Sequence, residues 1–213
     1  MTPTTASGET QIYRSSAHRR TSGRRRRWLA LLALVAVVGG VALWLGPGEK
    51  ALREITLPLR HEDIIRQQAR EKHLDPALIA AVIYQESKFS DRTSAAGAKG
   101  LMQILPSTAK FIAKRSGGTA FVPSDLATPQ VNIAYGSYYL RYLFQRYGGS
   151  KTLAVAAYNA GETNVNRWVS RAGGAREFKT KDIPFPETRA YVESVLRHQK
   201  DYRKHYPHEL GYK

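Results

Sequence analysis

The strongest hydrophobic pattern outside the N-terminal region runs from Asp75 to Ser87. Asp75 is a favoured N-cap residue, and Pro76 suits the first helical position because no intrahelical partner is needed for its nitrogen. Residues 77–84 are apolar on every face, which predicts a helix buried inside a domain. Glu86 follows near the end of this segment and shares a face with the apolar residues one and two turns before it.

Similar patterns predict further helices, so the fold is expected to be mostly α. Prolines stand at the early positions of several segments and glycines follow several of their ends, as helix boundaries require. The expected helices cover residues 60–73, 106–116, 129–147, 152–158, 163–171 and 186–205.

Residues 28–45 form 18 consecutive positions without a charged side chain. As a helix they would be about 27 Å long, which is close to the thickness of the hydrocarbon layer of a membrane. Trp28 and Trp44 mark the two ends, and the arginines at 24–27 favour a cytoplasmic N-terminus. We therefore expect an uncleaved, single-pass signal anchor in a bacterial cytoplasmic membrane, with the C-terminal part outside it. A cleaved signal peptide, with a weak cleavage site near residues 40–42, is the alternative.

One globular domain is expected to follow this anchor. Residues 1–27 are rich in Thr, Ser and Arg without apolar periodicity, so they are expected to be a disordered, basic cytoplasmic tail. Residues 46–58 are interpreted as a linker, because Gly-Pro-Gly at 46–48 interrupts a helix. The domain then covers residues 59–206, and residues 207–213 form a C-terminal tail.

Charge and cysteine content limit the partners and cofactors. The formal net charge is +16; seven arginines and one glutamate in residues 1–27 give +6 there, which leaves +10 for the rest. Such basicity favours an anionic partner. The arginine run directly precedes an apolar segment, so no nucleic-acid partner is expected. Without cysteines there are no disulfides or thiolate sites, and the six histidines lack ligand spacing, so no metal is expected.

Four short segments carry the candidate chemistry. They are Glu86-Ser87, then Gly100-Leu101-Met102-Gln103 with Pro106, then Ala157-Tyr158-Asn159-Ala160-Gly161, and finally Glu187-Thr188-Arg189 with Tyr191. In this order and at this spacing they resemble the catalytic domain of the soluble lytic transglycosylases. The resemblance covers roughly residues 60–205.

The resemblance implies a lysozyme-like fold of the α+β type, mostly helical, with a groove for a glycan strand. It implies cleavage of the β-1,4 bond between N-acetylmuramic acid and N-acetylglucosamine in peptidoglycan, with formation of a 1,6-anhydro ring on the muramyl product. Glu86 matches the family's single catalytic acid and base, and no metal or cofactor is implied.

The setting of Glu86 supports this chemistry independently. A carboxylate on an apolar face is costly to ionise, so its pKa should rise, which suits a general acid. Glycosidic cleavage usually takes two carboxylates. If the sugar's own C6 hydroxyl attacks the anomeric carbon, no second carboxylate is needed. Asp91, Glu162 and Glu187 are nevertheless close to the motifs in sequence, so the residues alone leave hydrolysis open.

The resemblance assigns substrate contacts to nine further residues: Ser87, Gly100, Met102, Gln103, Tyr158, Asn159, Ala160, Glu187 and Tyr191. Several of them have structural alternatives. Ser87 could cap its helix, Gly100 could serve a turn, and Met102 could fill the core. Gln103 could be a satisfied structural amide, Tyr158 and Asn159 a capping turn, and Glu187 a carboxylate placed favourably at a helix N-terminus.

Three functions therefore follow from the sequence. The leading hypothesis is a membrane-anchored peptidoglycan lytic transglycosylase. A muramidase would hydrolyse the same bond with a second carboxylate, and a non-catalytic wall-binding protein would keep the groove alone. A desolvated Glu86 favours an enzyme, because a binding module has no need of a buried acid.

Overall fold

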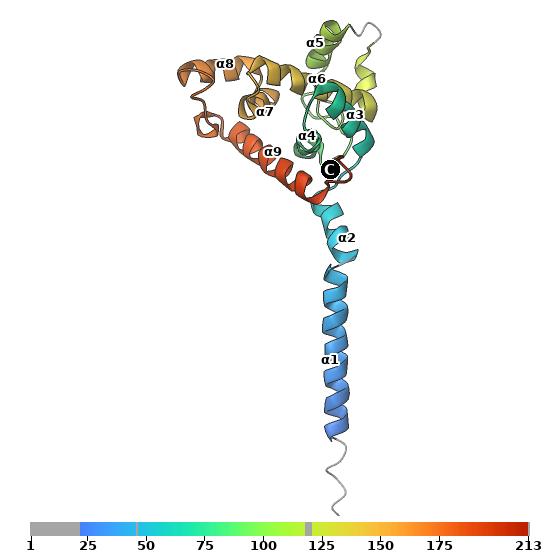
Figure 1. Cartoon of the computed structure of the whole chain (residues 1–213). Coiled ribbons are helices and arrows are strands. Elements are labelled where there is room, and N and C mark those ends of the chain that lie inside the picture. Colours follow the sequence, from blue (N-terminus) through green and yellow to red (C-terminus); the bar gives the residue numbers. More distant parts are fainter. Residues whose placement is uncertain (1–21, 46, 118–120, 213) are drawn as a thin grey trace, which may run out of the picture. The chain divides into compact units, whose positions relative to one another are not determined.

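The computed structural model describes residues 22–45, 47–117 and 121–212. It divides into two compact units, Met1–Leu52 and Arg53–Lys213, which are described separately (Figure 1). Helix α1 covers Ser22–Leu45, and α2 covers Pro47–Thr56.

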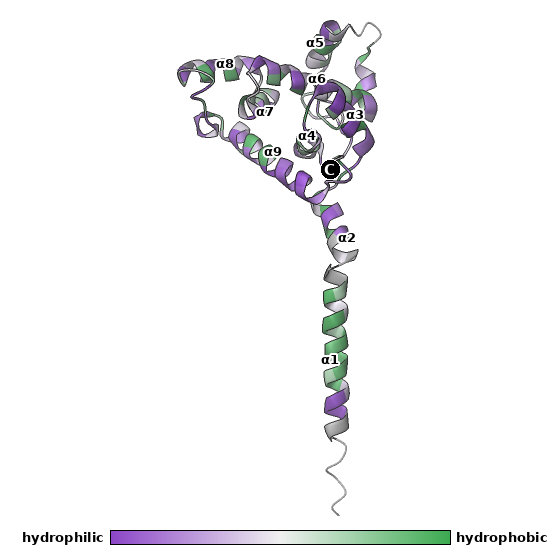
Figure 2. Cartoon of the chain, viewed as in Figure 1, coloured by the Kyte–Doolittle hydropathy of each residue, from purple (hydrophilic) through white to green (hydrophobic). Residues whose placement is uncertain are grey.

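Helix α1 contains the apolar segment, with hydrophobic residues along its middle and hydrophilic residues near its start (Figure 2). No helix among the described residues is long and apolar enough to cross a membrane. The membrane span expected over residues 28–45 is therefore not supported by the structure; the side chain of Trp44 lies outside what is described. The helix begins at Ser22, so residues 22–27 are helical rather than disordered, since arginine is a good helix former. Residues 1–21 of the expected tail lie outside the described residues.

The segment expected to be a linker is helical over Pro47–Thr56. Pro47 occupies the first helical position, where its missing N–H costs nothing. Pro47 and Gly48, which were expected to interrupt a helix, are thus the first two residues of α2, and the irregular part of the expected linker among the described residues is limited to residues 57–61.

The second unit is mostly helical, as expected. After α2 its elements are α3 Glu62–Lys72, α4 Pro76–Ser87, α5 Pro106–Ser116, η1 Pro123–Ala127, α6 Pro129–Arg146, α7 Lys151–Ala160, α8 Glu162–Arg171, η2 Thr180–Asp182 and α9 Pro186–His205. These confirm the predicted helices to within a few residues. Over the described ranges, β structure is limited to two isolated bridges, Thr93–Lys99 and Lys99–Ile104, so the β part of the expected α+β fold is no more than this loop.

Helix α4 is the centre of the core. Residues 77–83 are at most 1% exposed, and the helix packs chiefly against α9 and also against α3 (Figure 1). The Asp75 side chain accepts a hydrogen bond from the Ala77 N–H, which confirms the predicted N-cap. The same carboxylate accepts from the Tyr212 hydroxyl of the C-terminal tail and pairs with Arg203 of α9. The N-terminal end of α4 is thus fixed, and its other end carries Glu86.

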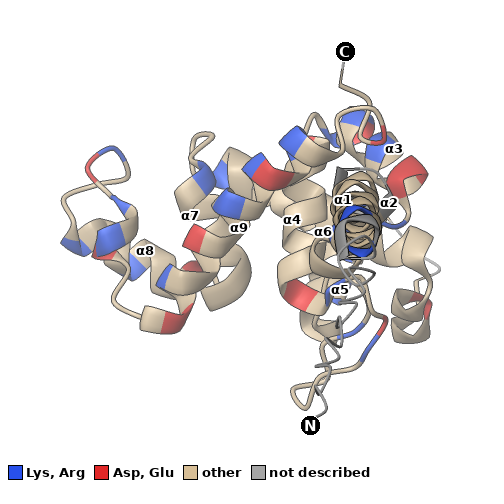
Figure 3. Cartoon of the chain, turned by 90° about the horizontal axis from the view of Figure 1, so that it is seen from below, with Lys and Arg blue, Asp and Glu red and all other residues tan. Residues whose placement is uncertain are grey.

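Exposed charges of both signs lie along α9 and neighbouring helices (Figure 3). The exposed residues of the second half of α9 are mainly basic: Arg197, Lys200, Arg203 and Lys204. Glu187 and Glu193 are exposed in its first half. The excess of positive charge is therefore interrupted by acidic residues on this helix.

Candidate active site

Residues from three of the four motifs interact at or near Glu86, which lies in the last turn of α4. The hydroxyl of Tyr191, from α9, donates a hydrogen bond to Glu86 Oε1 at 2.6 Å. Tyr158, from α7, is close enough for the Glu86 charge to affect its ionisation. The Arg92 guanidinium, from the loop after α4, donates to the backbone carbonyl of Glu86. Segments more than 100 residues apart in sequence thus surround one carboxyl group.

Burial dominates the electrostatics of Glu86. It raises the pKa of the carboxyl group from 4.5 to about 7, although the Tyr191 hydrogen bond and the Arg92 charge act to lower it. Burial and the Glu86 charge raise the pKa values of Tyr158 and Tyr191 well above 10.0, so both phenols stay neutral donors. Glu86 can therefore hold a proton near neutral pH and also release it, which a general acid and base must do.

Replacing Tyr191 by phenylalanine is expected to raise the pKa of Glu86 further, by about one to two units. The hydrogen bond from Tyr191, which this substitution removes, stabilises the ionised carboxylate, and such a bond is worth about 1.5–3 kcal/mol. NMR titration of protein labelled at the glutamate carboxyl carbons would measure the change. Tyr139→Phe is the matched control, because this ring contacts Tyr158 but not Glu86. An unchanged or lower pKa in Tyr191→Phe would contradict the assignment of this bond.

The Gly100–Gln103 loop is folded by its own polar groups. Gly100 has φ +74°, a left-handed conformation that favours glycine. The amide nitrogen of Gln103 donates to the carbonyl oxygens of Arg92 at 2.9 Å and Gly100 at 2.7 Å. The predicted amide is thus satisfied by backbone groups, and only its oxygen is left to meet a ligand.

Met102 and Tyr158 are joined by one hydrogen bond. Met102 is 0% exposed, so in this structure it supports the site from the core and offers no surface to a sugar. Its carbonyl oxygen accepts from the Tyr158 hydroxyl at 2.9 Å. The structure therefore brings the second and third motifs together through the backbone of Met102.

The remaining predicted residues lie in different surroundings. Ser87 is buried, and its hydroxyl donates to the Ile83 carbonyl oxygen one turn earlier in the same helix. Asn159 is exposed, and its side-chain oxygen accepts from Thr188, which ties α7 to α9. Ala160 is half-buried and Glu187 is exposed at the start of α9. Asn159, Ala160 and Glu187 are thus accessible to a ligand.

Sequence reasoning missed two residues that shape this site. Arg92 contacts the backbone of Glu86, and Asn132 of α6 bonds to the loop that carries Met102. Neither belongs to a motif that the sequence singled out. Asn132 lies on a predicted helix among apolar residues, and a polar side chain on that buried face was the signal available.

A second carboxylate near Glu86 is not evident. Among the described charged groups, Arg92 affects the pKa of Glu86, whereas Asp91, Glu162 and Glu187 do not. Glu162 instead accepts from the Tyr142 hydroxyl and lies 3.4 Å from Arg146. Within the described ranges no group of three His, Cys, Asp or Glu residues could hold a metal ion.

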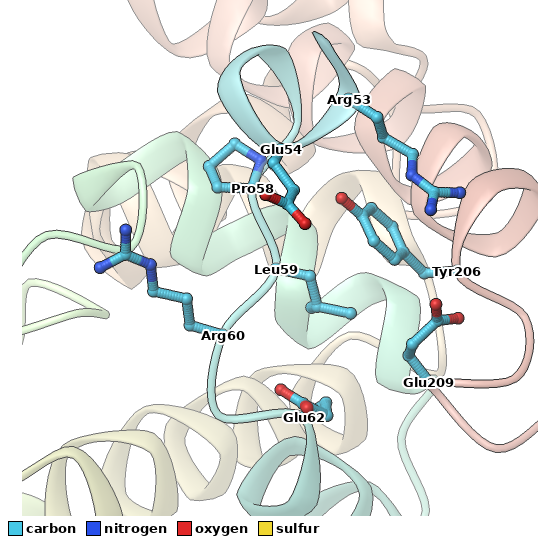
Figure 4. Close-up of a pocket in the computed structure, with 8 residues that line it drawn as sticks. All are labelled: Arg53, Glu54, Pro58, Leu59, Arg60, Glu62, Tyr206 and Glu209. Atoms are coloured by element: carbon cyan, nitrogen blue, oxygen red, sulfur yellow. The ribbon is translucent and has the colours of Figure 1, made fainter. Parts of the chain in front are cut away.

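A separate cavity of about 370 Å³ lies between the end of α2 and the C-terminal region (Figure 4). The Arg53 guanidinium lies 4.7 Å from the centre of the Tyr206 ring there. The cavity is lined by Arg53, Glu54, Pro58, Leu59, Arg60, Glu62, Tyr206 and Glu209. None of the predicted site residues lines it, so it is distinct from the surroundings of Glu86.

Comparison with known proteins places this site in a family. The family model described as the transglycosylase SLT domain matches residues 63–181, which is more than half of the chain. The soluble lytic murein transglycosylase of Salmonella typhimurium is 35% identical over 164 residues, covering 75% of this chain and 25% of that protein. The membrane-bound lytic murein transglycosylase C of Edwardsiella ictaluri is 30% identical over 169 residues, covering 68% of this chain and 47% of that protein.

A solved structure agrees with the sequence matches. The lytic transglycosylase Slt of Pseudomonas aeruginosa, in an inactive mutant with a glutamate replaced by glutamine, superposes with a TM-score of 0.65 at 33% identity. The match covers 71% of this chain and 25% of that one. The chain thus spans about a quarter of the length of the soluble relatives that it matches. By sequence and by fold, it belongs to the transglycosylase SLT domain family.

Proposed function

We propose that this protein is a peptidoglycan lytic transglycosylase in which Glu86 is the single acid and base. It would cleave the β-1,4 bond between N-acetylmuramic acid and N-acetylglucosamine and leave a 1,6-anhydro-muramic acid end. The observation that carries the proposal is the half-buried Glu86 carboxyl group: desolvation raises its pKa to about 7, and its Oε1 accepts a hydrogen bond from the Tyr191 hydroxyl at 2.6 Å.

The reaction follows from these groups. Tyr191 donates to Oε1, so the proton of the neutral carboxyl group is held on Oε2. That proton passes to the glycosidic oxygen as the bond to the muramyl C1 breaks. The muramyl C6 hydroxyl then attacks C1, and the Glu86 carboxylate accepts the hydroxyl proton. Because attacking group and leaving group are both in the substrate, no water is consumed and Glu86 is regenerated.

The other predicted residues divide into two roles in this proposal. The accessible ones, Gln103, Asn159, Ala160 and Glu187, would contact the glycan or its stem peptide. The buried ones, together with the half-buried Tyr158, would support Glu86 and the loop: Ser87, Gly100, Met102 and Tyr191. The net charge of +10 over residues 28–213 suits an acidic wall polymer.

Mass spectrometry of purified peptidoglycan digested by the full chain tests the reaction. Products that end in 1,6-anhydro-muramic acid are expected. Reducing-end products, heavier by one water, would mean hydrolysis and would require a second carboxylate, with Asp91, Glu162 and Glu187 the first to replace. Absence of cleavage with retained binding to pelleted walls would favour the non-catalytic alternative.

We further propose that residues 28–45 attach the enzyme to the outer side of the cytoplasmic membrane. This part rests on the uncharged sequence and on the arginines before it. The name of one relative, membrane-bound lytic murein transglycosylase C, is consistent with it. Extraction of the expressed full chain from membranes tests attachment: it should require detergent and resist alkaline carbonate. Release by carbonate would refute a membrane span.

A further inference from the structure

Asn132 on α6 makes an unusual set of contacts with the loop that carries the second motif. Its side chain is 0% exposed. Its Oδ1 accepts from the Met102 N–H at 2.7 Å, and its Nδ2 donates to the carbonyl oxygens of Lys99 at 2.8 Å and Leu126 at 2.9 Å. Three backbone groups are thus satisfied by one buried amide, which fixes their positions because each would be costly to leave unpaired.

Helix α6 is also shaped to receive this loop. A Cβ atom at Gly136, one turn after Asn132, would lie 2.3 Å from Met102 Sδ and 2.8 Å from Met102 Cβ. A Cβ atom at Gly100 would lie 2.2 Å from Asn132 Nδ2. Glycine at both places lets the loop and the helix meet at van der Waals contact, with Asn132 between them.

The contact continues toward Glu86. The Met102 N–H donates to Asn132 Oδ1, and the Met102 carbonyl oxygen accepts from the Tyr158 hydroxyl at 2.9 Å. We propose that Asn132 is a positioning residue for the reaction at Glu86: it holds the Met102 peptide so that Tyr158 is engaged there and does not bond to the catalytic carboxyl group. This inference rests on the proposed function of Glu86.

Loss of Asn132 should change the ionisation of Glu86 in a defined direction. The groups that face this carboxyl group are Tyr191 from α9, Arg92 from the loop and Tyr158 from α7. A Tyr158 hydroxyl released from Met102 can donate to Glu86 as Tyr191 does, and a loosened loop admits water. Both changes favour the ionised carboxylate and lower its pKa. A general acid is active when protonated, so the alkaline limb of the pH profile should move to lower pH.

The test compares the pH profiles of cleavage for the full chain and two variants. Asn132→Ala is expected to lower the maximal rate about 10- to 100-fold, as misplacement of a reacting group does, and to move the alkaline limb downward. Leu143→Ala is the matched control, because Leu143 is equally buried on α6 and offers only packing. A control profile with an unmoved limb is expected. If the alkaline limb of the pH profile of Asn132→Ala coincides with that of Leu143→Ala, the proposal is overturned.

A second variant and a second measurement keep the proposal testable if Asn132→Ala folds poorly or if the wild type does not cleave peptidoglycan. Gly136→Ala favours the helix but forces Met102 away, so it should also lower the rate; wild-type activity in Gly136→Ala would overturn the proposal. Hydrogen exchange at the Met102 amide should be slow in the wild type and at least about tenfold faster in Asn132→Ala than in Leu143→Ala. If the wild type does not cleave peptidoglycan, the proposed function fails, and with it the role of Asn132 in the reaction. Equal exchange rates in Asn132→Ala and Leu143→Ala would overturn the proposal that Asn132 holds the Met102 peptide in place.

Discussion

Glu86→Gln is expected to lower the rate of peptidoglycan cleavage by about 10²–10⁴-fold while binding to pelleted walls is retained. Glutamine keeps the size of the side chain and can accept the Tyr191 hydrogen bond, but it has no proton to give to the glycosidic oxygen. Cleavage is measured by release of anhydro-muropeptides under single-turnover conditions.

Asp91→Asn provides the matched control for Glu86→Gln. Asp91 is an exposed carboxylate in the loop after α4, and it does not affect the pKa of Glu86. This control should cleave at close to the wild-type rate. Cleavage by Glu86→Gln at the control rate would remove Glu86 from the mechanism, whereas a large loss in Asp91→Asn would indicate a second carboxylate and a hydrolytic reaction.

Glu86→Gln should also be more stable than the wild type at alkaline pH. The pKa of Glu86 is raised from 4.5 to about 7 in the folded protein, so folding holds the carboxyl group neutral. Stability from this group is complete below pH 4.5 and is lost as pH rises toward 7. Above pH 7 the free energy of unfolding of the wild type is therefore about 3 kcal/mol lower than below pH 4.5. Glu86→Gln does not undergo this loss, because glutamine does not ionise. Thermal unfolding should therefore show a gain for Glu86→Gln at pH 8 and none at pH 4.

The helices could be predicted because each boundary has a local cause. Asp75 and Pro76 start α4, and the glycine at 117 follows the end of α5, so the sequence alone places both. The helix over residues 47–56 is not predicted, because Pro47 and Gly48, its first two residues, have the composition of a turn. Proline at the first position starts a helix as readily as it ends one.

The site could be predicted only in part, because hydrogen bonds between distant segments have no local signal. Glu86 and Tyr191 were both found, but their contact joins residues 105 positions apart. The polar groups of Ser87 and Gln103 bond to nearby backbone in the fold, which a motif does not reveal. Asn132 was missed because a single polar residue on an apolar helix face does not show what it bonds to.

Gly100→Ala is expected to be the most disruptive small substitution in the loop, and Gly97→Ala is its control. Both glycines have left-handed backbones, with φ +74° and +79°, so alanine costs about 1–2 kcal/mol at either place. At Gly97 a Cβ atom has nothing within 4 Å. At Gly100 it would lie 2.2 Å from Asn132 Nδ2 and 2.6 Å from the Leu126 carbonyl oxygen. Overpacking adds about 1–3 kcal/mol there, for a total of about 2–5 kcal/mol.

Urea unfolding of the two alanine variants measures this difference directly. The clash at Gly100 involves a buried amide that already bonds to three backbone groups, so it cannot move without breaking those bonds. The loop must shift instead. Met102 shifts with it, and so does the Met102 carbonyl oxygen that accepts the hydrogen bond from the Tyr158 hydroxyl. Gly100→Ala should therefore lose cleavage as well as stability, whereas Gly97→Ala should lose only the backbone cost. Equal free energies of unfolding for the two variants would mean that the loop is not seated on Asn132 as the structure shows.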